Sequence, residues 1–240
     1  MIVISGKTVI KRGILFLGIF CIGVLGYYVQ EKKKLITVNS SVSSYCIVID
    51  AGHGKPDGGA TSKNGVEEET LNLLIAQKLK EKLENLGYEI VMTRKTHENI
   101  ATIDANQSLR NIKQSDLQNR VNIANQSMAD FMISIHMNEF ANSKYWGWQT
   151  FYSKNSQEGK ILASLIQKGI SQRIERPNHR TSLPIEGIKI VDKTNLPVVI
   201  VECGFLSNEE EVKLLQTDEY QNQLVEGIVS GIEDYYEGLN

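Results

Sequence analysis

The sequence predicts one α/β domain, a three-layer αβα sandwich around a twisted, mostly parallel mixed sheet of about six strands. Short apolar segments alternate along the chain with longer segments that repeat apolar residues at helical spacing. The segments at 46–49, 131–135 and 197–201 are apolar at nearly every position, which is typical of parallel strands covered by helices on both faces. The chain contains no internal repeat, so one continuous core is expected.

The first half of the domain is predicted to hold three of the strands. In order, the expected elements are a strand at 45–51, a helix at 68–86, a strand at 88–93, a long polar segment at 95–115, a helix at 116–128 and a strand at 131–135. One apolar stripe runs along the helix at 68–86, through Leu71, Ile75, Leu79, Leu83 and Leu86. Gly87 is expected to end that helix.

The second half continues the alternation. Its expected elements are an exposed or edge strand at 147–152, a helix at 157–175, strands at 187–191 and 197–201, an acidic helix start at 209–211 and a final helix at 218–236. Acidic residues at a helix start interact favourably with the helix dipole, and we expect 209–211 to be solvated.

Composition excludes several classes of protein. The chain has 240 residues, a formal net charge of −2 and 41% hydrophobic residues, which is ordinary for a globular protein. The near-neutral balance gives no electrostatic reason to expect nucleic acid as a partner. Because Cys21, Cys46 and Cys203 form no CxxC pair, we expect buried free thiols rather than a disulfide framework or a cysteine zinc site.

The N-terminal segment predicts membrane attachment. An apolar run at residues 14–29 follows three basic residues, and no small-residue cleavage site comes directly after it. We interpret residues 1–34 as a basic stretch and signal anchor, with a cleaved signal peptide or a buried core helix as alternatives. Residues 35–44 are a polar linker, and 45–240 form the folded domain, outside the cytoplasmic membrane.

Ionisable side chains follow three of the apolar strands. His53 stands between two glycines after the first strand, so the backbone can bend and the imidazole can project beyond the strand. His136 and Glu202 follow the strands at 131–135 and 197–201. Because ligands of open α/β sheets bind beyond the carboxyl ends of the strands, we expect one convergent site.

This set predicts a catalytic zinc site. Two imidazoles and one carboxylate, with water in an open fourth position, bind zinc in many hydrolases, which also need a second carboxylate as general base. The helix start near His53 offers Glu67, Glu68 and Glu69 in succession. Spacing alone leaves open which of them is used, and whether Glu202 is a ligand or the base.

Four segments, in this order, closely resemble the zinc-dependent N-acetylmuramoyl-L-alanine amidases of the type-3 family. They are VIDAGHG at 48–54, GVEEETLNL at 65–73, SIHMN at 134–138 and VECGFLSN at 201–208. The resemblance covers about residues 45–238. The family's usual Lys-Glu-Lys-Asp around the ligand reads Glu-Glu-Glu-Thr at 67–70, which makes the local field more acidic.

The resemblance implies specific roles. It implies one Zn²⁺ ion bound by His53, Glu68 and His136, with Glu202 as the catalytic residue. It also implies peptidoglycan as the substrate, cut at the amide between N-acetylmuramic acid and L-alanine. The family fold, a twisted mixed sheet between helices, agrees with the fold predicted from the alternation of strands and helices.

The domain organisation is similar to that of the germination-specific spore-cortex amidases. Removal of stem peptides by such enzymes allows muramic-δ-lactam to form, and relatives of this kind often depend on a separate activator protein. This implies a membrane-anchored or secreted enzyme of the spore cortex with an activator as partner. The alternatives are another zinc hydrolase, acting on cell-wall peptides or acetyl groups, and an inactive wall-binding domain.

Further residues have two possible roles each. Aromatic stacking on sugar rings and packing at a strand edge are both open for Trp146, Trp148 and Tyr152. We predict that Arg94 and Arg120 form structural ion pairs rather than substrate clamps.

Overall fold

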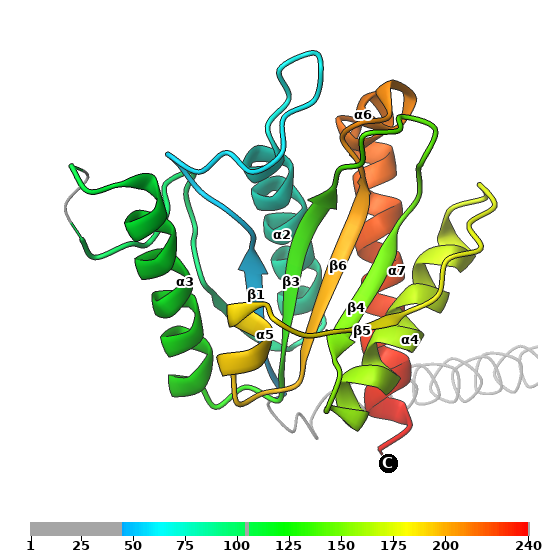
Figure 1. The fold of residues 1–240 in the computed structure, drawn as a ribbon. Helices are drawn as coiled ribbons and strands as arrows, with labels where there is room; N and C mark the ends of the chain where they lie inside the picture. Colours follow the sequence, from blue (N-terminus) through cyan, green and yellow to red (C-terminus); the bar gives the residue numbers. More distant parts are fainter. Residues whose placement is uncertain (1–44, 104–105, 240) are drawn as a thin grey trace, which may run out of the picture. The chain divides into compact units, whose positions relative to one another are not determined.

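The computed structural model describes residues 45–103 and 106–239 (Figure 1). The predicted signal anchor at 1–34 and the linker at 35–44 lie outside the described residues, as does Cys21. None of the helices in the described ranges combines the length and the apolar character that a bilayer crossing requires.

Six strands form one mixed sheet, as predicted. They are β1 (Cys46–Ala51), β2 (Glu89–Met92), β3 (Phe131–Asn138), β4 (Gln149–Ser153), β5 (Leu183–Ile185) and β6 (Val198–Phe205). Their spatial order is β2-β1-β3-β6-β4-β5, and every neighbouring pair is parallel except β4 with β6. The carboxyl ends of β1, β3 and β6 therefore meet at one edge of the sheet.

Helices cover both faces of this sheet, which completes the predicted three layers. One face carries α2 (Glu68–Asn85), α4 (Gln157–Arg173) and α7 (Asp218–Glu237), and the other carries α3 (Leu109–Gln126) and the short α5 (Lys189–Lys193) (Figure 1). The remaining helix, α6 (Glu209–Leu215), follows β6. The first face has the larger apolar core, so the second face is the thinner cover.

Alternation along the central strands decides which side chains face the thinner cover. Ile47 and Ile49 of β1 pack toward α2 and α7, whereas Val48 packs toward α3 and α5. Asp50 shares the face of Val48 because successive side chains of a strand point to opposite faces. The registers Asp50↔Ser134 and His136↔Glu202 then put all four of these polar residues on that face.

The strands β3 and β6 are longer than predicted. They continue to Asn138 and Phe205, so His136 and Glu202 lie within the strands rather than after them. The helix α3 begins at Leu109, well before the expected start near residue 116, because the Ser108 side chain accepts from the amide of Asn111 and caps it.

The prediction of an exposed or edge strand at 147–152 was wrong. β4 pairs with β6 on one side and with β5 on the other, and the Trp148 side chain before it is fully buried. Trp148 and Tyr152 therefore pack in the core, which removes both from the candidates for sugar stacking.

The prediction of a strand at 187–191 was also wrong. This segment leads into α5, and the neighbouring strand is the short β5. The branched apolar residues there predict a strand, yet Ile190 and Val191 bury their side chains in the cluster under α3 when the backbone turns helical. Tertiary packing outweighs local propensity in so short a segment.

Candidate metal centre

The backbone that carries His53 is held by two buried arginines. Arg120 donates hydrogen bonds to the carbonyls of His53 and, at 2.7 Å, Ala51. Arg94 donates to the carbonyls of Ala51 at 2.7 Å and Gly52 at 2.9 Å. These bonds hold His53 at a φ of 61°, a left-handed conformation that is uncommon for a residue other than glycine.

Gly52 permits a close approach of the two histidines. A Cβ at this position would lie 2.3 Å from the ring of His136, so any side chain would displace that imidazole. The rings of His53 and His136 are consequently 5.1 Å apart between centroids.

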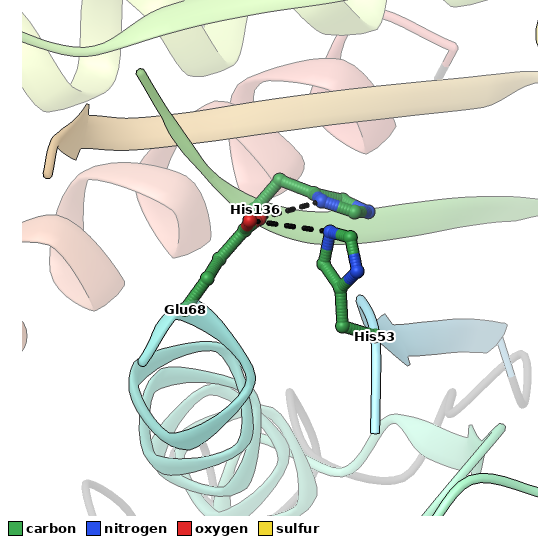
Figure 2. Close-up of side chains that lie close together, drawn as sticks. All are labelled: His53, Glu68 and His136. Carbon is green, nitrogen blue, oxygen red and sulfur yellow. Dashed lines mark hydrogen bonds and ion pairs between the residues drawn. The ribbon is translucent and has the colours of Figure 1, made fainter. Parts of the chain in front are cut away.

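Glu68 lies between the two imidazoles, at the first turn of α2. Its Oε2 is 3.2 Å from Nε2 of His53, and its Oε1 is 2.9 Å from Nδ1 of His136 (Figure 2). One ligand atom from each of the three side chains fits within 4.8 Å of the others. Burial opposes the charged carboxylate of Glu68, but hydrogen bonds to His136 and His53 outweigh burial and hold its pKa far below the usual range.

The two neighbouring glutamates point elsewhere. Glu67 forms an ion pair with Lys55, and the buried carboxylate of Glu69 lies 3.7 Å from Arg94 and 3.1 Å from the His97 imidazole. Among the three adjacent glutamates, Glu68 is the one whose carboxylate contacts both site histidines.

Asp57 fixes the orientation of the His53 ring. Its Oδ2 lies 3.0 Å from Nδ1 of His53, and its Oδ1 lies 2.8 Å from Nζ of Lys113. When His53 is neutral and donates from Nδ1, its lone pair is on Nε2, so the proton that Nε2 shares with Glu68 must leave before this atom can bind a metal ion. Burial lowers the pKa of His53, but hydrogen bonds to Asp57 and Glu68 outweigh burial and raise it to about 9.

Glu202 stands beside this group across the pair of strands β3 and β6. It is the register partner of His136, and its buried Oε2 atom has no hydrogen-bond partner among the described residues. Burial raises the pKa of Glu202 to about 7, with Glu68 adding to the rise and the site histidines opposing it. A buried carboxylate oxygen without a partner is costly unless a ligand or water completes its bonding.

These observations test whether a zinc ion would suit the residues present. Two imidazole nitrogens and one carboxylate oxygen, already gathered within 4.8 Å, match the donors of catalytic zinc sites with an open position. The unpartnered carboxylate of Glu202 is a second carboxylate that the ligand set does not use. The donor set therefore fits zinc.

A cavity of about 290 Å³ opens beside the site on the thinner face of the sheet. His53, His136 and Glu202 line one side of it. Its apolar lining is formed by Leu117, Ile188, Ile190 and Ile200.

A buried ionic network supports the site from below. Arg120 pairs with Asp50 at 2.6 Å and with Asp116 at 2.7 Å, and Asp50 also accepts from Ser134 and Thr93 at 2.6 Å each. The predicted structural roles are confirmed by these contacts for Arg120 and by the ion pair with buried Glu69 for Arg94. Sequence reasoning missed Asp50, although a charged residue inside an otherwise apolar strand is itself a signal of buried ionic pairing.

Other predictions have mixed outcomes. Cys46 and Cys203 are free and buried, as expected. The expectation that 209–211 are solvated was wrong for Glu211, which is fully buried and accepts from the amides of Gly147 and Phe205. Leu86 was expected in the apolar stripe of its helix but is 48% exposed, because it follows the last turn of α2.

Comparison with known sequences supports a single family. The sequence profile described as N-acetylmuramoyl-L-alanine amidase matches residues 47–234. The germination-specific N-acetylmuramoyl-L-alanine amidase of Bacillus subtilis is 32% identical over 195 residues, which are 81% of this chain and 81% of that protein. LytC, an N-acetylmuramoyl-L-alanine amidase of the same organism, is 29% identical over 86% of this chain and 38% of its own length.

Solved structures agree with the sequence comparison. The CwlD amidase from Clostridioides difficile, solved in complex with the GerS lipoprotein, is 37% identical and matches with a TM-score of 0.78 over 81% of this chain and 99% of that one. An N-acetylmuramoyl-L-alanine amidase from Clostridium difficile 630 is 30% identical and matches with a TM-score of 0.72 over 82% of this chain and 99% of that one.

Proposed function

The chain belongs to the N-acetylmuramoyl-L-alanine amidase family, and from this membership we propose that His53, Glu68, His136 and Glu202 form its catalytic site. The reaction is hydrolysis of the amide between the lactyl group of N-acetylmuramic acid and L-alanine in peptidoglycan. The observation that supports this assignment most directly is the gathering of three ligand atoms within 4.8 Å beside an unpartnered buried carboxylate.

His53, Glu68 and His136 hold one zinc ion in this proposal. When bound, zinc supplies a Lewis acid that polarises an amide carbonyl and lowers the pKa of water. The hydrogen bond from His53 to Asp57 fixes the tautomer that offers Nε2 as a ligand atom. The amides of Ala60 and Met137 donate to Glu68 at 2.9 and 3.0 Å and hold its carboxylate in place.

Glu202 is the general base and then the general acid. Its buried Oε2 accepts the proton of the attacking water while a C–O bond forms at the amide carbon. It then passes that proton to the nitrogen as the C–N bond breaks, which releases the peptide as an amine. The pKa of about 7 suits both transfers, because a base that must also act as an acid works best near the ambient pH.

The biological setting follows from the named relatives. Similarity to the germination-specific amidase supports a role in spore-cortex maturation, where peptide removal permits formation of muramic-δ-lactam. The domain at 45–240 then acts outside the cytoplasmic membrane, behind the anchor at 1–34. The complex of CwlD with the GerS lipoprotein supports a dedicated activator protein as a partner of this chain.

Digestion of spore-cortex peptidoglycan by the purified, zinc-loaded full chain tests this proposal. Mass spectrometry of the products is expected to find intact glycan and free stem peptides that begin with alanine. Shortened stems or lost acetyl groups would indicate a different zinc hydrolase, and binding without any product would indicate a wall-binding domain. Removal of zinc with a chelator should abolish cleavage, and added zinc should restore it.

A further inference from the structure

Arg180, in the segment between α4 and β5, contacts a residue that shares a face of the sheet with Glu202. Gln149 of β4 is the antiparallel register partner of Glu202, and directly opposed residues of such a pair point to the same face. The Oε1 atom of Gln149 accepts a hydrogen bond from Nη1 of Arg180 at 3.2 Å. The guanidinium is thereby placed beside the catalytic face, on the side away from β1 and α3.

The position of Arg180 is fixed by the core as well as by Gln149. Its amide donates to the Asn178 side chain at 3.1 Å, and its carbonyl accepts from Gln167 of α4 at 3.1 Å. Its guanidinium carbon lies 4.8 Å from the centroid of the Phe205 ring, at the end of β6. A side chain that is already held by stacking, on a backbone that is held by hydrogen bonds, loses little additional conformational freedom when it binds a ligand.

The donors of Arg180 are used differently from those of the two buried arginines. Arg94 and Arg120 are fully buried, and each donates four hydrogen bonds to carbonyl or carboxylate oxygens. The Arg180 guanidinium is half-buried and donates one, to a neutral amide oxygen. Within residues 45–103 and 106–239 it forms no salt bridge, although a guanidinium offers five donors.

The carboxylate of Glu211, whose pKa Arg180 affects, already has hydrogen-bond partners. Burial raises the pKa of Glu211, and the amides of Phe205 and Gly147, then Arg176 and Arg180, oppose that rise. Both carboxylate oxygens of Glu211 accept backbone amides, at 2.7 Å from Gly147 and 2.8 Å from Phe205. The remaining donors of Arg180 are therefore available to an anion that comes from outside the chain.

We propose that Arg180 binds a carboxylate of the stem peptide while the amide bond lies at Glu202. This inference rests on the proposed amidase function. The planar guanidinium matches a carboxylate with two parallel hydrogen bonds, a geometry that a lysine does not offer. The lactyl carboxyl of the sugar is consumed in the amide, so the carboxylates near the scissile bond belong to the peptide.

The other side of the site is a poor place for that carboxylate. The cavity near His53 is lined by Lys113, which is paired with Asp57 at 2.8 Å, and by Arg120, which is paired with Asp50 and Asp116, so both cations already have carboxylate partners. Neighbouring strands are about 4.8 Å apart, and an extended peptide spans about 3.4 Å per residue. Arg180 is thus within reach of a carboxylate on the second or third residue of the stem.

The test compares two muropeptides that differ only in having stem carboxylates or the corresponding carboxamides. With the zinc-loaded full chain, Arg180→Gln is expected to lower kcat/KM for the carboxylate substrate by about tenfold to a hundredfold, mostly through KM. Cleavage of the carboxamide should change by less than about threefold. Arg180→Lys should recover part of the loss, because it keeps the charge but not the paired geometry.

A binding measurement complements the kinetics. In the Glu202→Gln background, calorimetric titration should show the same preference for the carboxylate muropeptide, and Arg180→Gln should remove that preference. Arg173→Gln is the matched control, because Arg173 is an exposed arginine in the last turn of α4 with no assigned role. It should leave both substrates unaffected.

The outcomes distinguish a failure of the Arg180 contact from a failure of the proposed amidase function. Equal losses of Arg180→Gln on both muropeptides, or no loss on either, would overturn the carboxylate contact while the amidase function stands. A variant that unfolds is replaced by Arg180→Lys, and full activity of that variant on the carboxylate substrate would contradict paired recognition. A wild-type chain that cleaves neither muropeptide, even with its activator protein added, would overturn the amidase assignment and the Arg180 contact together.

Discussion

Charged groups are paired on one side of the site and incompletely paired on the other. On the side of β1 and α3, the charged groups of the buried network are paired: Arg120 with Asp50 and Asp116, and Lys113 with Asp57. On the side of β6 and β4, a buried oxygen of Glu202 has no partner within residues 45–103 and 106–239, and the Arg180 guanidinium donates one hydrogen bond, to a neutral group. In the proposed mechanism, the paired side holds the ligand atoms in position, and the unpaired side offers groups for substrate and water.

This difference has a physical basis. A fully paired buried network is rigid because separating any pair would leave an unpaired charge in a medium of low polarity. Groups that exchange protons or bind an anion must keep some donor or acceptor atoms without partners from the protein itself. The comparison predicts that substitutions on the paired side change stability and metal affinity, whereas substitutions on the unpaired side change turnover.

The largest effect is expected on the unpaired side. Glu202→Gln keeps the shape of the side chain but cannot accept the proton of water, so kcat should fall by about 10²- to 10⁴-fold. Zinc content by atomic absorption and the melting temperature should match those of the wild type. Retained turnover in the zinc-loaded variant would show that another group moves the proton.

On the paired side, Arg120→Met should destabilise the fold by about 3 to 5 kcal/mol, since it leaves Asp50 and Asp116 buried without their cation. Urea unfolding of the zinc-free chain measures this change in free energy. Arg110→Met replaces an exposed arginine of the same helix and should change stability by no more than about 0.5 kcal/mol. Similar values for the two variants would contradict the structural role of Arg120.

A smaller effect is expected at the junction of the network and the ligands. Asp57→Asn should weaken zinc binding by about tenfold to a hundredfold, because an amide does not fix the His53 tautomer as a carboxylate does. Competition with a chromogenic chelator measures this affinity. Glu98→Gln, an exposed substitution on the same side, is the control, and equal affinity of both variants would exclude Asp57 from ligand orientation.

The smallest effect concerns the pH dependence of stability. Burial raises the pKa of Asp50, but Arg120, Ser134 and Thr93 outweigh burial and hold it below the ordinary value of 3.8. A carboxylate with a depressed folded pKa contributes stability above its unfolded pKa and loses it as the pH falls through the folded pKa. Ser134→Ala removes one charge-assisted bond and should cost about 1.5 kcal/mol at pH 7.

That cost should shrink as the pH falls from the ordinary pKa of 3.8 through the lower pKa of folded Asp50, because the carboxylate then becomes protonated. Urea unfolding of both proteins at pH 7 and at successively lower pH measures the difference. A cost that stays constant across this range would mean that the carboxylate of Asp50 is not the acceptor that matters.

The strands and the long helices followed from local pattern. The apolar runs of β1, β3 and β6, and the stripe along α2, are signals that depend on neighbouring residues only, and the structure has these elements in the predicted order. Segments with weak or short patterns were misjudged. α5 was predicted as a strand because its branched residues favour strands, and β4 was predicted at an edge because the pairing of β5 leaves no local signal.

The amino-acid sequence by itself determined the alternation of strands and helices and the four motifs that mark the family. Spacing left three adjacent glutamates open and the family resemblance implied Glu68, but only the tertiary structure decided that the Glu68 carboxylate contacts both histidines and that Arg180 contacts Gln149, the register partner of Glu202. The reason is geometric, since adjacent residues at a helix start point in different directions. Which direction meets the histidines depends on how α2 packs on the sheet, and the place of Arg180 depends on the pairing of β4 with β6, contacts between residues far apart in the chain.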